Sequence, residues 1–134
     1  MTPQERARAL RPYIEKAAAS LSDRDASLAV ELSGGYPGDG SLVEAGTRIN
    51  WKGELFRAAV SLWATEQNDP DHAPNLWERV LYRDGIRIIP EVITAGLTFA
   101  RDELGWWGDV LYKSLYDNNA HTPAAWPQGW EAVT

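Results

Sequence analysis

Two segments of this chain repeat each other, and the repeat is the feature that most limits its fold. Residues 74–80 read PNLWERV and residues 127–133 read PQGWEAV, so Pro, Trp, Glu and Val recur at the same offsets. The similarity continues upstream without a gap, since residues 46–58 (GTRINWKGELFRA) align with residues 102–114 (DELGWWGDVLYKS). Between these blocks the first copy has three extra residues. The sequence therefore predicts a duplicated unit of roughly 35 residues, with the length difference in a loop.

The duplication separates candidate core residues from candidate functional ones. A unit this small, in a chain without cysteine, must use large aromatic side chains as its core. We therefore assign the aromatic residues that recur in both copies chiefly to the two cores: Phe56, Trp77, Tyr112 and Trp130. Aromatic residues that only one copy carries are the better candidates for contact with a partner.

The residues before the first copy are predicted to be helical. Thr2 is expected to cap a helix, with Pro3 at its first position and Glu5 completing a capping box. Pro12 removes one backbone hydrogen bond, so we expect a kink or a break there. A second short helix is expected after Ser22 and should end at the glycine-rich segment that follows.

Apolar residues of the first helix form a narrow seam. They are spaced alternately three and four residues apart: Ala7, Leu10, Ile14, Ala17 and Leu21. Such a heptad seam either packs on its own domain or pairs with another helix. Because two very small β modules offer little surface for docking, we predict self-association through this helix.

Composition shifts divide the rest of the chain. A dense run of Gly and Pro follows the helices and is interpreted as a linker. Beyond it, short aromatic alternations favour β structure, and Gly53 fits a tight hairpin turn. Gly85 and Gly96 are expected at turns of a second hairpin-like stretch. The predicted layout is a helical head (1–32), a linker (33–42), a first module (43–82), a connector (83–98) and a second module (99–134).

The composition argues against several classes of function. The net charge is −6 at pH 7, and Lys and Arg form no stripe among the aromatic residues, so nucleic acid is not expected as a partner. With no cysteine and only two histidines, a zinc centre is not expected either. No signal peptide or apolar run of membrane length is evident, so we expect synthesis in the cytoplasm and no membrane insertion. No cofactor is predicted.

One loop carries residue types that catalysis uses. Asp69 and Asp71 flank a proline beside His72, and two acids with an imidazole could do acid–base work or bind a cation. We interpret it instead as a solvated loop in which the aspartates stabilise turns. His121 lies in a similar loop without a nucleophile nearby in the sequence. The protein is therefore predicted not to be an enzyme.

Each copy combines an aromatic strand, a Gly or Asp turn, a Leu-aromatic-basic-small segment, and Pro-x-x-Trp-Glu-x-Val after a polar loop. This pattern resembles the small chitin- and cellulose-binding modules of carbohydrate-binding families 5 and 12. Residues 104–133 resemble especially the version found in phage and prophage tail-associated proteins. The resemblance implies an α+β chain, with an N-terminal helical oligomerisation segment followed by two small three-stranded antiparallel β modules.

The chain departs from the free-standing family modules at their sugar platform. Those modules usually carry one or two exposed tryptophans shortly after the aromatic-x-Ala segment. The equivalent places hold Val60 and Ser61 in the first copy, and Tyr116 and Asp117 in the second. We interpret the first copy as having lost its platform, whereas the second keeps a tyrosine.

The candidate ligand residues follow from this comparison and from the chemistry of sugars. Flat aromatic faces stack on pyranose rings, while Asp, Asn and Gln side chains bond the hydroxyl groups. Trp126 has no indole counterpart in the first copy, and Trp106 should face away from its neighbour Trp107 across the strand. The predicted carbohydrate-binding residues are Tyr116, Trp126, Asp117, Asn118, Asn119, Trp63 and Trp106, with Gln128 as a further polar candidate.

The resemblance implies a non-enzymatic phage or prophage virion protein, tail- or fibre-associated, that binds polysaccharide or cell-surface glycan beside other virion proteins. It would reside in the virion after assembly in the host bacterial cytoplasm. A homo-oligomer is expected, and a trimer is preferred by analogy with viral fibres. One alternative is a structural connector or capsid decoration protein whose modules serve only assembly. Another is a detached binding domain accessory to a glycan-degrading enzyme.

Overall fold

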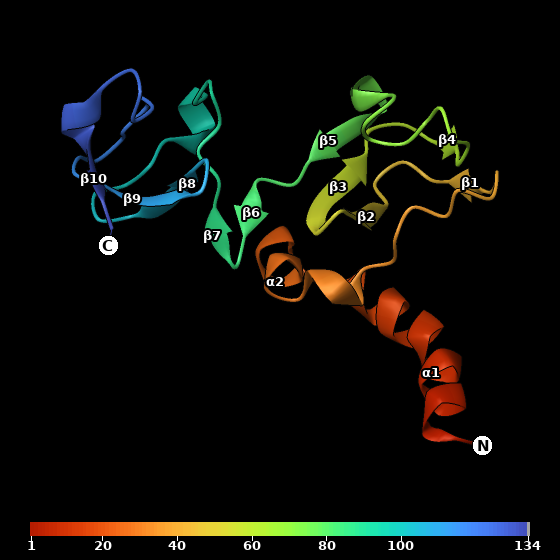
Figure 1. Ribbon diagram of the computed structural model, residues 1–134. Helices are drawn as coiled ribbons and strands as arrows, with labels where there is room; N and C mark the ends of the chain where they lie inside the picture. The colour runs from red at the N-terminus through yellow and green to blue at the C-terminus, as the bar shows by residue number, and fades with distance from the viewer. Residues whose placement is uncertain (134) are drawn as a thin grey trace. The chain divides into compact units, whose positions relative to one another are not determined.

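The computed structural model describes residues 1–133 and divides into two compact units, one up to Val80 and one from Leu81 onward. Two N-terminal helices are followed by small antiparallel sheets (Figure 1). The predicted α+β class is confirmed, including the two three-stranded modules. Two further two-stranded pairs accompany them, so the chain has more β structure than the resemblance implies.

The helical head begins where the capping residues predict. Helix α1 (Pro3–Ala18) starts after Thr2, whose hydroxyl accepts a hydrogen bond of 3.1 Å from the Glu5 N–H. Helix α2 (Asp23–Leu28) starts after Ser22, and the 3-10 turn η1 (Val30–Leu32) follows it. A kink or a break was predicted at Pro12, and the break is wrong, because α1 runs through this proline. A proline inside a helix removes one backbone bond, which the remaining turns of α1 tolerate.

The first unit is built on an antiparallel sheet of order β2-β3-β5: β2 (Arg48–Trp51), β3 (Glu54–Ala58) and β5 (Trp77–Arg79). Lys52 and Gly53 connect β2 to β3 and both have positive φ, as a tight hairpin turn requires. Strands β1 (Leu42–Val43) and β4 (Leu62–Trp63) form a separate pair, and the 3-10 turn η2 (Pro74–Leu76) leads into β5. The buried core consists of Val43, Ile49, Ala58, Leu62, Ala64 and Trp77.

The second unit repeats this sheet with order β8-β9-β10: β8 (Leu104–Trp107), β9 (Val110–Ser114) and β10 (Trp130–Ala132). A hairpin of β6 (Tyr82–Arg83) and β7 (Ile86–Arg87) precedes it, with Gly85 at the predicted turn. Gly96 is not at a hairpin turn but inside the 3-10 turn η3 (Ala95–Leu97), and η4 (Pro127–Gly129) leads into β10. The buried core consists of Ile89, Phe99 and Trp130.

The two sheets have the same register, which confirms the alignment of the two copies. Ile49 pairs with Phe56 as Gly105 pairs with Tyr112, and the closing strands pair through Ala58–Trp77 and Ser114–Trp130. The indole of the closing strand also makes the same bond in both units. Trp77 Nε1 donates to the Asn68 carbonyl at 2.8 Å, and Trp130 Nε1 donates to the His121 carbonyl at 2.6 Å.

The duplicated unit is longer than the sequence comparison shows. Gly35 forms a parallel bridge with Asn50 at the edge of β2, and Ile88 forms the same bridge with Trp106 at the edge of β8. The predicted linker and connector therefore contribute the first extended segment of each module. Gly35 and Ile88 make these bridges through their backbone groups, while the residues that follow them, Tyr36 and Ile89, pack on the cores of their units.

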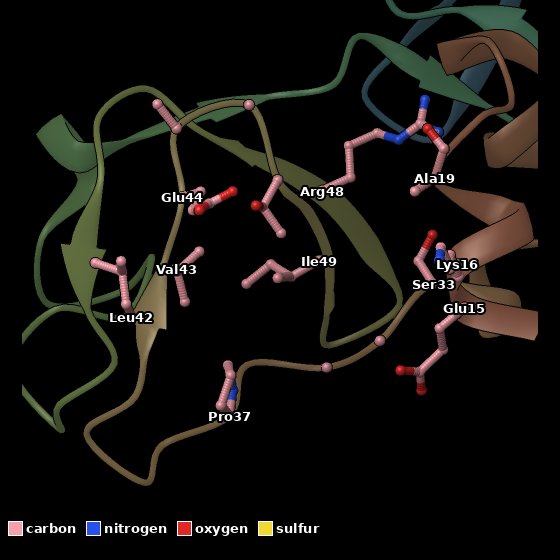
Figure 2. Close-up of a pocket in the computed structure, with 15 residues that line it drawn as sticks. Glu15, Lys16, Ala19, Ser33, Pro37, Leu42, Val43, Glu44, Arg48 and Ile49 are labelled. Carbon is pink, nitrogen blue, oxygen red and sulfur yellow. Dashed lines mark hydrogen bonds between the residues drawn. The ribbon is translucent and has the colours of Figure 1, made fainter. Parts of the chain in front are cut away.

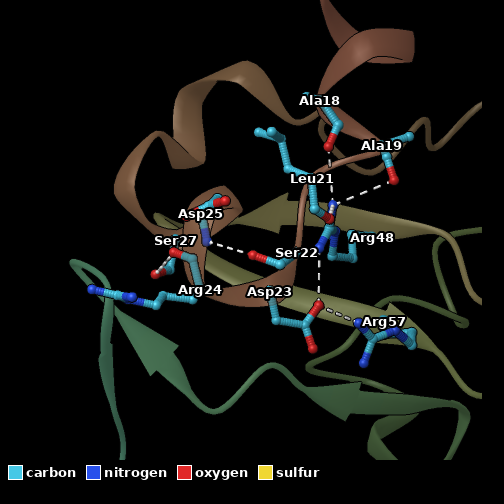
Figure 3. Close-up of polar contacts among 10 residues, drawn as sticks. All are labelled: Ala18, Ala19, Leu21, Ser22, Asp23, Arg24, Asp25, Ser27, Arg48 and Arg57. Atoms are coloured by element: carbon cyan, nitrogen blue, oxygen red, sulfur yellow. Dashed lines mark hydrogen bonds and ion pairs between the residues drawn. The ribbon is translucent and has the colours of Figure 1, made fainter.

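One arginine docks the helical head on the first sheet (Figure 3). The Arg48 side chain is 8% exposed and donates to the carbonyls of Ala18 (2.9 Å) and Leu21 (2.7 Å). It also pairs with Asp23 at 2.9 Å, and Arg57 bonds the same Asp23 carboxylate. The C-terminal carbonyls of a helix carry partial negative charge and lack helical partners, so a guanidinium satisfies both needs.

The predicted heptad seam lies uncovered along α1, which extends away from the sheet of its own unit (Figure 1). Ala7 and Ala17 are exposed, as are Leu10 (46%) and Ile14 (39%), and only Leu21 is half-buried. The seam is thus available for another helix, and self-association through it stays a prediction.

We predict that Arg48→Leu, which introduces the residue of the second copy at this position, loosens the head. The change removes the side-chain donor to the Ala18 and Leu21 carbonyls and to Asp23, and it should cost about 2 kcal/mol. Amide hydrogen exchange should then accelerate in α1 and α2 but not in β8, β9 and β10, which serve as an internal reference. Arg8→Leu on the exposed side of α1 is the matched control. Equal exchange in both variants would contradict the docking role of Arg48.

Candidate functional site

Three side chains of the second unit form an aromatic cluster: Tyr116, His121 and Trp126. The ring centroids of Tyr116 and Trp126 are 4.9 Å apart with planes tilted by 32°, so the two rings pack closely against each other at a tilt. The His121 ring meets Trp126 edge-on at 5.6 Å. Tyr116 is 51% exposed and Trp126 is half-buried. The structure thus brings together two of the predicted ligand residues, with the tyrosine as the more accessible one.

The loop between β9 and β10 positions the cluster. Tyr116 leaves β9 with its carbonyl accepting a hydrogen bond of 2.8 Å from the Ser114 hydroxyl. Trp126 donates its backbone N–H to the Thr122 carbonyl at 2.9 Å, just before η4. Its six-membered ring lies against Gly129, where an added Cβ would be only 2.4 Å from Trp126 Cε3. The glycine therefore makes room for the indole.

The first copy fills the same space differently. The backbone bond from Trp126 to Thr122 corresponds to the bond from Ala73 to Asp69, so Ala73 occupies the position of Trp126. Leu76, which packs on the core of its unit, occupies the position of Gly129. An alanine–leucine pair in one copy thus replaces a tryptophan–glycine pair in the other. Comparing these two positions together in the aligned sequences would have identified Gly129 as part of the site.

Asp117 and Asn118 lie beside the cluster along the chain, and both are exposed. Asp117 Oδ1 accepts a hydrogen bond of 3.1 Å from the Arg101 N–H, as the Ser61 hydroxyl does from Ala45 in the first copy. This bond engages one carboxylate oxygen. Asn118 has a φ of 52°, in the left-handed region that asparagine tolerates. These two residues remain candidates for bonding sugar hydroxyls.

Asn119 is not available to a ligand, so its assignment to the binding surface is corrected. Its side chain donates to Ser114 Oγ at 3.1 Å and to the Gly129 carbonyl at 3.0 Å, and the residue is 2% exposed. Its backbone bridges to Phe99, as the buried Leu62 pairs with Val43 in the first copy. Asn119 is therefore an interior residue that fastens the loop.

The two remaining tryptophan candidates lie apart from the cluster. Trp106 is half-buried, and its indole donates to the Arg83 carbonyl at 3.0 Å while the Arg83 guanidinium lies 5.4 Å from the ring. It therefore packs on the β6–β7 hairpin. Trp63 belongs to the first unit, is 61% exposed and pairs across β1–β4 with the exposed Leu42. Gln128 is exposed within η4.

The acidic loop of the first copy serves its own structure. Asp69 accepts the His72 backbone N–H at 2.8 Å, and its Oδ1 also lies 2.8 Å from His72 Nδ1. Burial acts to raise the pKa of Asp69, but these bonds and the charge of His72 outweigh it and lower the pKa. Asp71 bonds Lys52 and the Trp51 indole, which together lower its pKa. Each carboxylate thus has a partner within the loop or the adjoining hairpin.

Other kinds of site find little support. Within residues 1–133, no three His, Asp or Glu side chains gather so that they could hold a metal ion. In the same range no helix has the length and apolar character to span a membrane. Neither a protein-family model nor a curated protein matches the sequence.

We predict that the alanine–leucine pair of the first copy can replace the tryptophan–glycine pair of the second. Trp126→Ala alone should destabilise the second unit by about 3 kcal/mol, because it leaves a cavity over Gly129. Adding Gly129→Leu should recover most of that loss, since the pair then matches Ala73 and Leu76. Urea unfolding followed by the fluorescence of the remaining tryptophans measures both effects. If the double variant is no more stable than the single one, the two loops are not equivalent.

Proposed function

We propose that this protein is a non-enzymatic component of a phage or prophage virion, tail- or fibre-associated, that binds polysaccharide through its second module. One observation carries the proposal: an exposed tyrosine, Tyr116, is backed by Trp126 where the first copy has Val60 and Ala73. A module that only needs a core gains nothing from an exposed aromatic ring at this position. The resemblance to chitin- and cellulose-binding modules points to sugar as the ligand.

The geometry favours a single-ring platform. Because the ring centroids of Tyr116 and Trp126 are only 4.9 Å apart and the planes are tilted by 32°, the two rings cannot lie side by side as a wide flat surface. Trp126 supports one side of the tyrosine, which leaves the other side for the apolar face of a pyranose ring. Asp117 and Asn118 follow directly in the chain and can bond the hydroxyl groups at the rim of that sugar.

One stacking ring gives weak binding, so the function depends on several copies. A homo-oligomer formed through the exposed seam of α1 would present several second modules on one particle, and avidity would then supply the strength. A trimer is the form that we prefer, beside other virion proteins as partners.

A structural role is the second candidate. The exposed pair of Trp63 and Leu42 lies in the first unit and has no part in the aromatic cluster. Exposed apolar pairs of this kind often mark protein interfaces. A connector or capsid decoration protein would use that pair and the α1 seam for assembly and would bind no sugar.

We predict that Tyr116→Ala reduces retention on insoluble chitin or cell-wall glycan at least about tenfold, because it removes the stacking face. Tyr116→Phe should keep most of the retention. Tyr13→Ala is the matched control, because Tyr13 is an exposed tyrosine outside the second module, in α1, and its removal should leave retention unchanged. Thermal unfolding should be nearly the same in all three variants. Unchanged retention in Tyr116→Ala, or a blank glycan array for the native chain, would favour the structural role.

A further inference from the structure

Asp117, next to the exposed Tyr116 of the second module, carries a charge that the fold does not require. Its Oδ1 accepts a hydrogen bond of 3.1 Å from the Arg101 N–H. In the first copy the Ser61 hydroxyl accepts the corresponding bond, also of 3.1 Å, from the Ala45 N–H. A neutral oxygen is thus enough to hold this part of the loop. The charge and the second oxygen of Asp117 are available for another purpose.

The chain itself does not neutralise the Asp117 carboxylate. Within residues 1–133 this carboxylate forms no ion pair, and its Oδ2 receives no hydrogen bond. Arg101 supplies its backbone N–H, while its guanidinium makes no ion pair with Asp117 in the same range. The Asp117 side chain is exposed, so a cationic group from solution can reach the free oxygen.

The loop of the second copy also contains one residue that the first copy lacks. Asn119 corresponds to Leu62, because each bridges to the same core position of its unit. Asp117 corresponds to Ser61, so Asn118 between them is an extra residue. Asn118 is exposed and has a φ of 52°, which asparagine tolerates better than most residues. The insertion thus adds a polar amide directly after the unpaired carboxylate.

The corresponding part of the first copy lacks both the ring and the charge. Val60 and Ser61 stand there. The same unit has an open groove of about 860 Å³, lined by Gly34 and residues 42–49 among others, and Figure 2 shows Glu44 in its wall. None of the residues that line this groove is aromatic, so a pyranose ring has no face there on which to stack. The comparison of the two copies therefore directs attention to the loop of the second.

We propose that the second module binds a glycan whose sugar units carry a protonated primary amine, as deacetylated glucosamine units do. This inference rests on the proposed function, because it takes Tyr116 as the ring on which the sugar stacks. Tyr116 and Asp117 lie where the chain turns after β9, so the carboxylate is at the rim of the platform. It pairs with the ammonium group, and the aromatic face attracts the same cation.

The expected preference for the amine is modest. An exposed ion pair and an exposed cation–π contact each contribute little, so we expect an amine-bearing glycan to bind about fivefold more tightly than its N-acetylated form. Salt screens exposed charges, and the preference should therefore shrink as the salt concentration rises. Several amines along one glycan chain, bound by several modules, would multiply the effect.

The test is a titration of the full chain with two hexasaccharides, the glucosamine hexamer and its fully N-acetylated form, under conditions in which the amines are protonated. Backbone amide NMR signals of residues 116–118 report binding, and those of β3 in the first unit serve as the reference. We expect the glucosamine hexamer to bind about fivefold more tightly. Equal binding of both hexamers would overturn this inference and leave the proposed function intact. If neither hexamer binds, both fail.

Two variants separate Asp117 from the overall negative charge of the chain. Asp117→Ser introduces the residue of the first copy, which keeps an acceptor for the Arg101 N–H but removes the charge. It should bring the two hexamers to about equal affinity. Asp109→Asn is the matched control, because it removes an exposed carboxylate at the other end of β9 and should keep the preference. Persistence of the preference in Asp117→Ser, or its loss in Asp109→Asn, would contradict the inference.

A lysine peptide tests whether the sugar ring is needed. The peptide acetyl-Gly-Lys-Gly-amide offers a primary amine without a pyranose face, so it should bind far more weakly than the glucosamine hexamer. Binding as tight as that of the hexamer would show that the loop recognises a bare amine, and the glycan would then be the wrong ligand.

Discussion

The buried indole of the closing strand is the interaction on which both modules depend. Trp77 and Trp130 are 6% and 5% exposed, and each fills the core of a small unit that has no disulfide. Each also donates its Nε1–H to a carbonyl of the preceding loop, at Asn68 or His121. One side chain thus closes the core and fixes the loop. In the second unit that loop carries His121 and Trp126, so the stability of the module and the geometry of the aromatic cluster are coupled.

Around this shared indole the two copies place large and small side chains at different neighbouring positions. Ile49 in the first copy corresponds to Gly105 in the second, where a Cβ would lie 2.7 Å from Ile89 and 2.9 Å from Phe99. The larger Phe99 replaces Val43, so the glycine offsets the added ring. The exchange of Ala73 and Leu76 for Trp126 and Gly129 follows the same rule. Close packing permits a large side chain only where a neighbour becomes small.

The sequence predicted the elements whose signals are local or repeated. The capping residues of α1, the tight turn at Gly53 and the correspondence of the two sheets all depend on residue types at fixed spacing. The sequence comparison did not predict the edge segments at Gly35 and Ile88, because backbone groups make those bridges and glycine and isoleucine share no residue pattern. The sequence did not predict the burial of Asn119 either, because a polar residue in a loop is normally expected to be exposed to solvent. Such residues are placed by tertiary contacts, which single-sequence patterns do not record.

Duplication explains how one small fold can carry two separate surfaces. Arg48 and Leu104 occupy the same position in the same register, yet only the arginine can hold the end of a helix. Likewise Gly34 and Arg87 begin the same segment, but only the glycine leaves a groove open. The first copy has thus diverged toward the head, and the second toward an exposed aromatic ring. Because each unit has its own core, a change at one surface need not disturb the other.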